Sequence, residues 1–126
     1  MTEPESQSRF EAVVQEIADW LSSEGYTEVT GLIDELPNPE KIYWPDHSGG
    51  YLPDLAARRG EQFNIFKVET MDTIENKDSN AKWKLFAAEA ARIGGGFYLV
   101  IPEGCEPAVG EQLGKLGIHA GIIVVG

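Results

Sequence analysis

Apolar residues recur along this chain in two rhythms, and the rhythm separates predicted helices from predicted strands. Over residues 6–24 they recur at spacings of three and four, which predicts a helix with one buried stripe. Gly25 follows, where helices commonly end. Residues 80–93 show the same spacing before Gly94 and predict a second helix. A weaker pattern over 106–116, interrupted by glycines, predicts a third.

Shorter apolar stretches between these helices predict five strands. Residues 26–33 alternate loosely and are rich in β-branched side chains. Two apolar runs, 50–57 and 62–71, flank a short polar turn that contains glycine, which is typical of a hairpin. The continuous apolar run 97–101 indicates a buried central strand, and 118–125 indicates a last strand.

The order of these elements predicts the architecture. Residues 34–50 carry three prolines and paired glycines and are predicted to be irregular. The remaining order is helix, three strands, helix, strand, helix, strand. The early strands suit an antiparallel meander, whereas the later ones alternate with helices and favour parallel neighbours. We therefore expect a single domain over residues 1–126 of the α/β class (α+β in some classifications), with a mixed sheet and helices on both faces.

The charge of the chain is strongly negative but unevenly distributed. A formal net charge of −11 weighs against tight binding to nucleic acid, because that affinity depends on Lys and Arg at the phosphates. Seven of the ten Lys and Arg residues nevertheless lie within residues 58–92, either as a solvated surface or as a patch that faces an anion. Trp44, next to Pro45, either covers an edge of the core or lines a groove on which a base could stack.

Several features bear on the cellular environment. No apolar run approaches the roughly 18 residues of a membrane span, so no membrane partner is expected. The first residues are acidic and polar, unlike a secretory signal, and the single Cys105 suits a reducing compartment. These features predict a cytoplasmic protein. A homodimer is compatible with the sequence, although no apolar stripe is left over to indicate an interface.

The predicted hairpin contains two carboxylates in otherwise apolar runs, Asp54 in the first strand and Glu69 in the second. Carboxylates are rarely buried without a partner or a metal. Lys67 shares a strand face with Glu69, because side chains two residues apart point the same way. Two carboxylates on adjacent strands suit Mg²⁺, and with an ammonium they form a minimal set for metal-assisted hydrolysis of a phosphodiester. The plain alternatives are a strand-end residue for Asp54 and the start of a polar loop for Glu69.

The motifs of the hairpin resemble a known family. Pro53-Asp54, the hairpin and Val68-Glu69-Thr70 look like the core of the PD-(D/E)XK nuclease superfamily, which has the restriction-endonuclease-like fold. Phe10-Glu11 resembles the opening helix of that family. Residues 82–90, leading into 97–102, are similar to the helix and strand that follow its catalytic hairpin.

The resemblance implies a nuclease that uses Mg²⁺, with Mn²⁺ as a substitute. Asp54 and Glu69 would be catalytic and would bind the metal, and Thr70 would lend its backbone carbonyl to it. Glu11 would reach the same site from the first helix, although a solvated helix face explains this glutamate equally well.

One position departs from the family pattern. Lysine is expected two residues after the second carboxylate, and this chain has Met71 there, whose thioether cannot orient a water or donate to an anion. Lys67 and Lys82 are the candidate replacements. Lys82 is preferred, because it lies in the first turn of the predicted following helix, where members of the family that this chain resembles sometimes place their polar catalytic residue. If neither reaches the site, the chain is a catalytically inactive relative that acts as a binding or interaction module. A third interpretation is an unrelated α/β domain.

Overall fold

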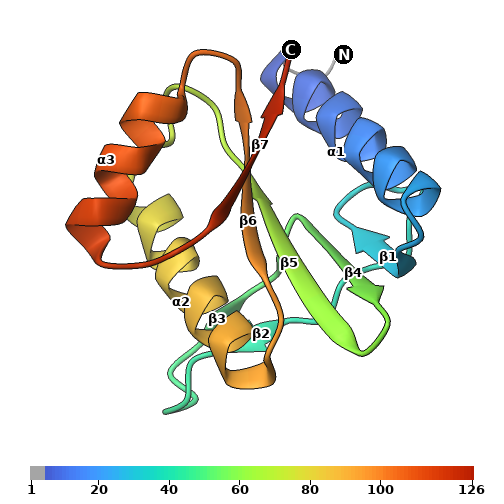
Figure 1. The fold of residues 1–126 in the computed structure, drawn as a ribbon, viewed down its shortest axis with the longest axis horizontal. Helices are drawn as coiled ribbons and strands as arrows, with labels where there is room; N and C mark the ends of the chain where they lie inside the picture. Colours follow the sequence, from blue (N-terminus) through green and yellow to red (C-terminus); the bar gives the residue numbers. More distant parts are fainter. Residues whose placement is uncertain (1–4) are drawn as a thin grey trace.

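A mixed five-stranded sheet forms the centre of the fold in this computed structural model, which describes residues 5–126 (Figure 1). The strand order is β1-β4-β5-β6-β7. Antiparallel pairing joins β1 (Thr27–Gly31), β4 (Leu55–Arg59) and β5 (Gln62–Val68). β6 (Phe97–Pro102) and β7 (Gly121–Val125) continue the sheet in parallel. The predicted meander followed by parallel strands is confirmed.

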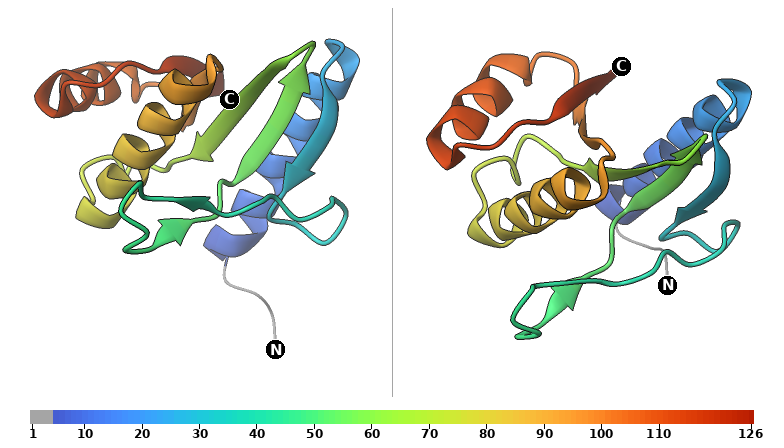
Figure 2. Two further views of the ribbon diagram at one scale, coloured as in Figure 1. Left: turned by 90° about the horizontal axis from the view of Figure 1, so that it is seen from below. Right: turned by 60° about the horizontal axis from the view of Figure 1, so that its bottom comes forward.

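Helices cover both faces of the sheet, as the sequence predicts (Figure 2). α1 (Glu5–Ser23) packs on one face, and α2 (Lys77–Ile93) and α3 (Glu106–Leu116) lie over the other. Successive residues of β5 therefore enter different cores. Ile65 packs on the α2 and α3 side, and its neighbour Phe66 packs against α1.

The helix boundaries follow local capping. α2 begins three residues before the predicted helix, because the Asn76 side chain accepts hydrogen bonds from the backbone N–H groups of Asp78 and Ser79. It ends at Gly94, whose φ of 72° is in the left-handed region that favours glycine. Among the helices of residues 5–126, none has the length and hydrophobicity that a membrane-spanning segment needs.

The irregular segment before the hairpin contains a small ribbon that the sequence analysis missed. β2 (Ile42–Tyr43) pairs antiparallel with β3 (Gly50–Tyr51), apart from the main sheet. Gly50 permits this approach, because a Cβ there would lie 2.1 Å from the carbonyl oxygen of Ile42. The predicted first strand over 50–57 is thus wrong at its start: Gly50–Tyr51 belongs to the ribbon, and β4 begins only at Leu55.

Candidate functional site

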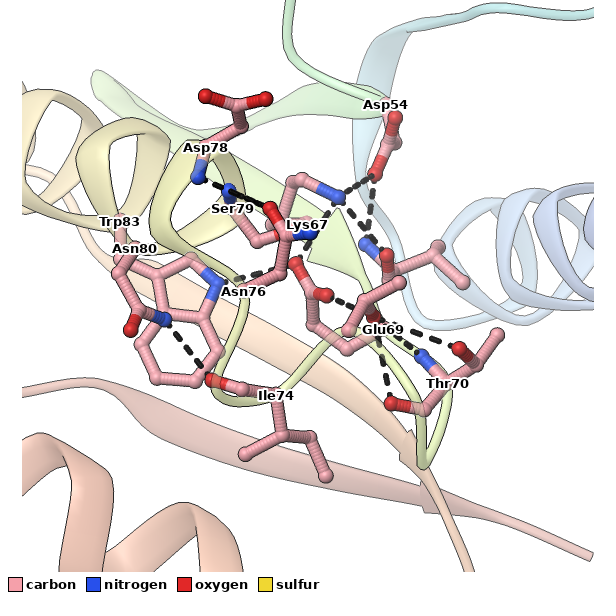
Figure 3. A network of polar contacts seen from close by, with 12 residues as sticks. Asp54, Lys67, Glu69, Thr70, Ile74, Asn76, Asp78, Ser79, Asn80 and Trp83 are labelled. Atoms are coloured by element: carbon pink, nitrogen blue, oxygen red, sulfur yellow. Dashed lines mark hydrogen bonds and ion pairs between the residues drawn. The ribbon is translucent and has the colours of Figure 1, made fainter.

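Asp54, Lys67 and Glu69 meet on the α2 face of the sheet, where β4 begins and β5 ends (Figure 3). The register that pairs Leu55 with Phe66 brings Asp54 opposite Lys67. Lys67 and Glu69 flank Val68, which packs toward α1, so they point to the other face. The three residues are nearly buried, with 7 % of Asp54, 8 % of Lys67 and 2 % of Glu69 exposed. The structure thus brings together the two carboxylates that the sequence indicated.

The ammonium of Lys67 links the two carboxylates. Its Nζ lies 3.2 Å from Oδ2 of Asp54 and 2.9 Å from Oε1 of Glu69. It also donates a 2.9 Å hydrogen bond to the backbone carbonyl of Val68. The same Asp54 oxygen accepts a 2.7 Å hydrogen bond from the backbone N–H of Val68, which ties the segment before β4 to β5. One cation is therefore surrounded by three protein oxygens.

Glu69 is held at both carboxylate oxygens. The indole N–H of Trp83 donates to Oε1 over 3.0 Å, and the hydroxyl of Thr73 donates to Oε2. The backbone N–H of Glu69 donates to the carbonyl of Val100 in β6 over 2.9 Å. The carboxylate therefore has a fixed orientation, set by α2, the turn after β5 and the neighbouring strand.

The electrostatics of the cluster favour positive charge. Burial raises the pKa of the Asp54 carboxyl, and the opposing effects of Lys67 and of the Val68 N–H do not cancel this rise. Burial acts to lower the pKa of Lys67, but Asp54 and Glu69 together outweigh it, so the Lys67 pKa is raised. Counted formally, with +1 for Lys67 and −1 for each carboxylate, the cluster has an excess of one negative charge. Binding a proton or another cation offsets this charge.

The other lysine candidate lies elsewhere. The Nζ of Lys82 is 5.4 Å from the ring centre of Tyr51, which is a cation–π contact. Because α2 begins at Lys77, Lys82 lies in its second turn and not in the first turn as predicted. The structure thus places Lys67, and not the preferred Lys82, against the two carboxylates.

The remaining predicted residues are spread around the cluster. The carbonyl of Thr70 accepts a 3.1 Å hydrogen bond from the backbone N–H of Thr73, within the turn after β5. Glu11 is half-buried on α1, which packs on the face of the sheet opposite Lys67 and Glu69. Met71 is 75 % exposed. β5 ends at Val68 and not at residue 71 as predicted, so Glu69 and Met71 both lie beyond the strand.

Two residues that hold Glu69 were not singled out from the sequence. Trp83 belongs to the apolar pattern of residues 80–93 and is completely buried, but its indole N–H also needs an acceptor. That need is the signal that could have linked it to a buried carboxylate. The role of Thr73 depends on the path of the turn, which no local pattern reveals.

The oxygens around Lys67 also suit a divalent cation. Asp54, Glu69 and the carbonyl of Val68 provide oxygen ligands of the kind that Mg²⁺ prefers. All three oxygens contact the same positively charged group, the Lys67 ammonium. Within residues 5–126, no group of three or more His, Cys, Asp or Glu side chains is arranged to hold a metal. The two side chains that could hold a divalent cation at this cluster are Asp54 and Glu69, and the backbone carbonyl of Val68 offers a third oxygen.

No protein-family model matches the chain, and no match was found among curated proteins or solved structures. The resemblance to the PD-(D/E)XK nucleases therefore stays a prediction from the residues of the hairpin. The function has to be inferred from the chemistry of the cluster itself.

Proposed function

We propose that the chain is a nuclease-like protein of the PD-(D/E)XK type, which hydrolyses phosphodiester bonds of nucleic acid with Mg²⁺. The observation that supports this proposal is the contact of the Lys67 ammonium with both Asp54 and Glu69 at the end of the hairpin. Phosphodiester hydrolysis needs positive charge to offset the charge on the phosphate and a donor for its oxygens. The order of helix, hairpin, helix and strand is also that of the restriction-endonuclease-like fold.

Each residue has a distinct role in this proposal. Asp54 and Glu69 would hold the divalent cation, which would supply Lewis acidity and offset the charge of the phosphate. Trp83 and Thr73 keep the Glu69 carboxylate in one orientation. In the reaction, a water oxygen forms a bond to phosphorus and gives up a proton to solvent, the bond to the leaving oxygen breaks, and that oxygen takes up a proton from solvent.

Lys67 is the lysine that we assign to the substrate phosphate, because its ammonium already lies between the two carboxylates. A divalent cation would replace the ammonium as their countercharge. The ammonium could then donate to a phosphate oxygen. Met71 has no part in this arrangement, since it is exposed in the turn beyond β5.

A second candidate is a nuclease-fold module that binds without cleaving. It is favoured by the completeness of the hydrogen bonds around Lys67, which contacts three oxygens, while Glu69 accepts at both of its own. Among the described residues, no buried side-chain nitrogen or oxygen is left without a partner. In this candidate the ammonium takes the place of the metal permanently, and the cluster stabilises the hairpin.

Cleavage of plasmid and labelled oligonucleotides with Mg²⁺ or Mn²⁺ tests the proposal. We expect cleavage by the wild type and a loss of at least about 100-fold in Asp54→Asn, Glu69→Gln and Lys67→Met, because each removes a group that contacts the metal or the phosphate. Asp72→Asn, which changes an exposed carboxylate, and Lys82→Gln should cleave nearly as the wild type does. A folded wild type that binds oligonucleotides but never cuts them would favour the second candidate.

A further inference from the structure

A groove of about 320 Å³ lies between the β2–β3 ribbon and α2, away from the Asp54–Lys67–Glu69 cluster. Its lining comes from residues 41–47, which contain β2, and from α2, and its charged and aromatic members are Lys41, Tyr43, Trp44, His47, Glu89 and Arg92. Figure 2 shows this ribbon beside α2 and apart from the main sheet. Nothing in the proposed hydrolysis uses these side chains.

The groove presents an exposed aromatic ring together with a cation. Tyr43 is 57 % exposed, which is high for an aromatic side chain, whereas Trp44 is half-buried and packs against the core. The Nζ of Lys41 lies 5.6 Å from the centre of the Tyr43 ring. A largely exposed ring with a cation over one face can offer its other face to a base, while the cation gives countercharge to a phosphate.

The charge of the groove is opposite to that of the chain. The whole chain has a formal net charge of −11, yet the groove is lined by Lys41 and Arg92 and by one carboxylate, Glu89. Glu89 accepts two hydrogen bonds from Arg92, at 2.7 and 2.8 Å, so these two charges balance each other and Lys41 supplies the excess positive charge. The groove therefore suits an anionic ligand.

The loop that carries Trp44 and His47 is well ordered by its own hydrogen bonds. The N–H of Trp44 donates to the carbonyl of Gly49 over 2.8 Å, and the N–H of His47 donates to the carbonyl of Trp44 over 2.9 Å. These bonds hold His47 at a φ of 59°, which is uncommon for a residue other than glycine. The aromatic and basic side chains of the loop are thus presented from a fixed backbone.

We propose that this groove binds a single-stranded segment of nucleic acid. A base stacks on Tyr43, and a phosphate faces Lys41. A base face is open to such stacking only where the strand is not part of a duplex, and this selects single-stranded over double-stranded nucleic acid.

The inference rests on the proposed function in one respect, namely that the bound strand is the substrate of the cluster. α2 connects the two places, since Trp83 contacts Glu69 and Arg92 lines the groove. The rise of an α-helix separates these two positions by about 13 Å along its axis, a span that a few nucleotides cover. The groove would then hold the strand beside the point of cleavage.

Binding of a labelled oligothymidylate, measured by fluorescence anisotropy in EDTA, tests the inference without any cleavage. We expect Tyr43→Ala to weaken binding roughly 5- to 150-fold, the range for loss of one stacked base, and Tyr43→Phe to retain it. Lys41→Gln should reduce the slope of log affinity against log salt by about 0.7. Arg59→Gln is the matched control, because Arg59 lies 5.3 Å from the Tyr26 ring and forms a similar pair outside the groove.

The outcomes separate this inference from the proposed hydrolysis. Binding that depends on Tyr43, without cleavage in Mg²⁺, supports the groove and contradicts the nuclease proposal. Cleavage with an unchanged KM in Tyr43→Ala contradicts the groove alone. The inference is also overturned if the wild type shows no saturable binding, if Arg59→Gln weakens binding as much as Tyr43→Ala, or if polyglutamate displaces the oligonucleotide as well as unlabelled oligothymidylate does.

Discussion

Trp83 of α2 donates its indole N–H to the carboxylate of Glu69, just beyond the end of β5, over 3.0 Å. Both residues are almost completely buried. This bond connects the main helix of one face with the charged cluster of the sheet. It links helix packing to the geometry of the proposed site, because the orientation of Glu69 depends on where α2 lies.

Trp83→Phe should therefore lower the free energy of unfolding by about 2 kcal/mol, a typical loss for one hydrogen bond to a charged group. The phenyl ring keeps most of the packing, while Oε1 of Glu69 loses one of its two donors. Urea unfolding measures the change. Trp20→Phe is the control, since Trp20 is 44 % exposed on α1 and its substitution should have little effect. Equal stability of Trp83→Phe and the wild type would contradict the role of this bond.

Lys67→Met should be the most destabilising single change in the cluster. It keeps a long apolar side chain but leaves two buried carboxylates without their cation, which costs about 3–5 kcal/mol. Thermal melting compares this variant with the double variant Lys67→Met/Asp54→Asn. The melting temperature of the double variant should lie between those of Lys67→Met and the wild type, because one uncompensated buried charge is removed.

Mg²⁺ provides a second measurement on the same variants. If Asp54 and Glu69 hold a divalent cation, millimolar Mg²⁺ should raise the melting temperature of Lys67→Met more than that of the wild type, where the ammonium competes. The double variant should gain less. Identical shifts in all three proteins would show that the ion acts elsewhere.

Stability should depend on pH through Asp54. Burial raises its pKa in the folded protein, so the folded state binds this proton more tightly than the unfolded state. The contribution of this proton to the free energy of unfolding is fully present below the pKa of Asp54 in the unfolded chain, about 3.9. It is lost as the pH rises through the higher pKa of Asp54 in the folded protein. Asp54→Asn should remove this decline in denaturant unfolding between acidic and neutral pH.

Asp46 provides a control of opposite sign. Hydrogen bonds from Ser48 lower the pKa of the exposed Asp46 carboxyl. Its contribution to stability is present above the unfolded pKa and is lost as pH falls through the folded value. In Asp46→Asn the free energy of unfolding should therefore still decline above about pH 4, as it does in the wild type through Asp54. If both variants change the pH profile alike, the assignment to Asp54 is wrong.

Hydrophobic periodicity was sufficient to predict the three helices and the main strands, because each buries one face or both. The ribbon of β2 and β3 was missed for a physical reason. Its strands have two residues each, too few for any period, and their pairing depends on the close approach of Gly50 to Ile42. The earlier start of α2 depends on the cap by Asn76, outside the apolar stripe.

The candidate site was predictable only where strand geometry determines it. The two-residue period places Lys67 on the face of Glu69, and the hairpin brings in Asp54. The family resemblance favours Lys82 as the catalytic lysine, whereas the structure places the Lys82 ammonium over the ring of Tyr51. The contacts of Trp83 and Thr73 depend on how a helix and a turn return to the sheet, which is tertiary information.

The weak helical pattern of α3 allows a final prediction, that Gly110→Ala stabilises the protein. Gly110 lies within α3, is exposed, and a Cβ there would meet no other atom within 4 Å. Replacing glycine by alanine in a helix interior is worth about 1 kcal/mol, so the free energy of unfolding should rise by up to this amount. Gly95→Ala is the contrast, because its Cβ would lie 1.8 Å from the carbonyl oxygen of Phe63 and should destabilise the protein. Urea unfolding of both variants measures the change. If Gly110→Ala lowered the free energy of unfolding more than Gly95→Ala does, the exposed position of Gly110 on α3 would be contradicted.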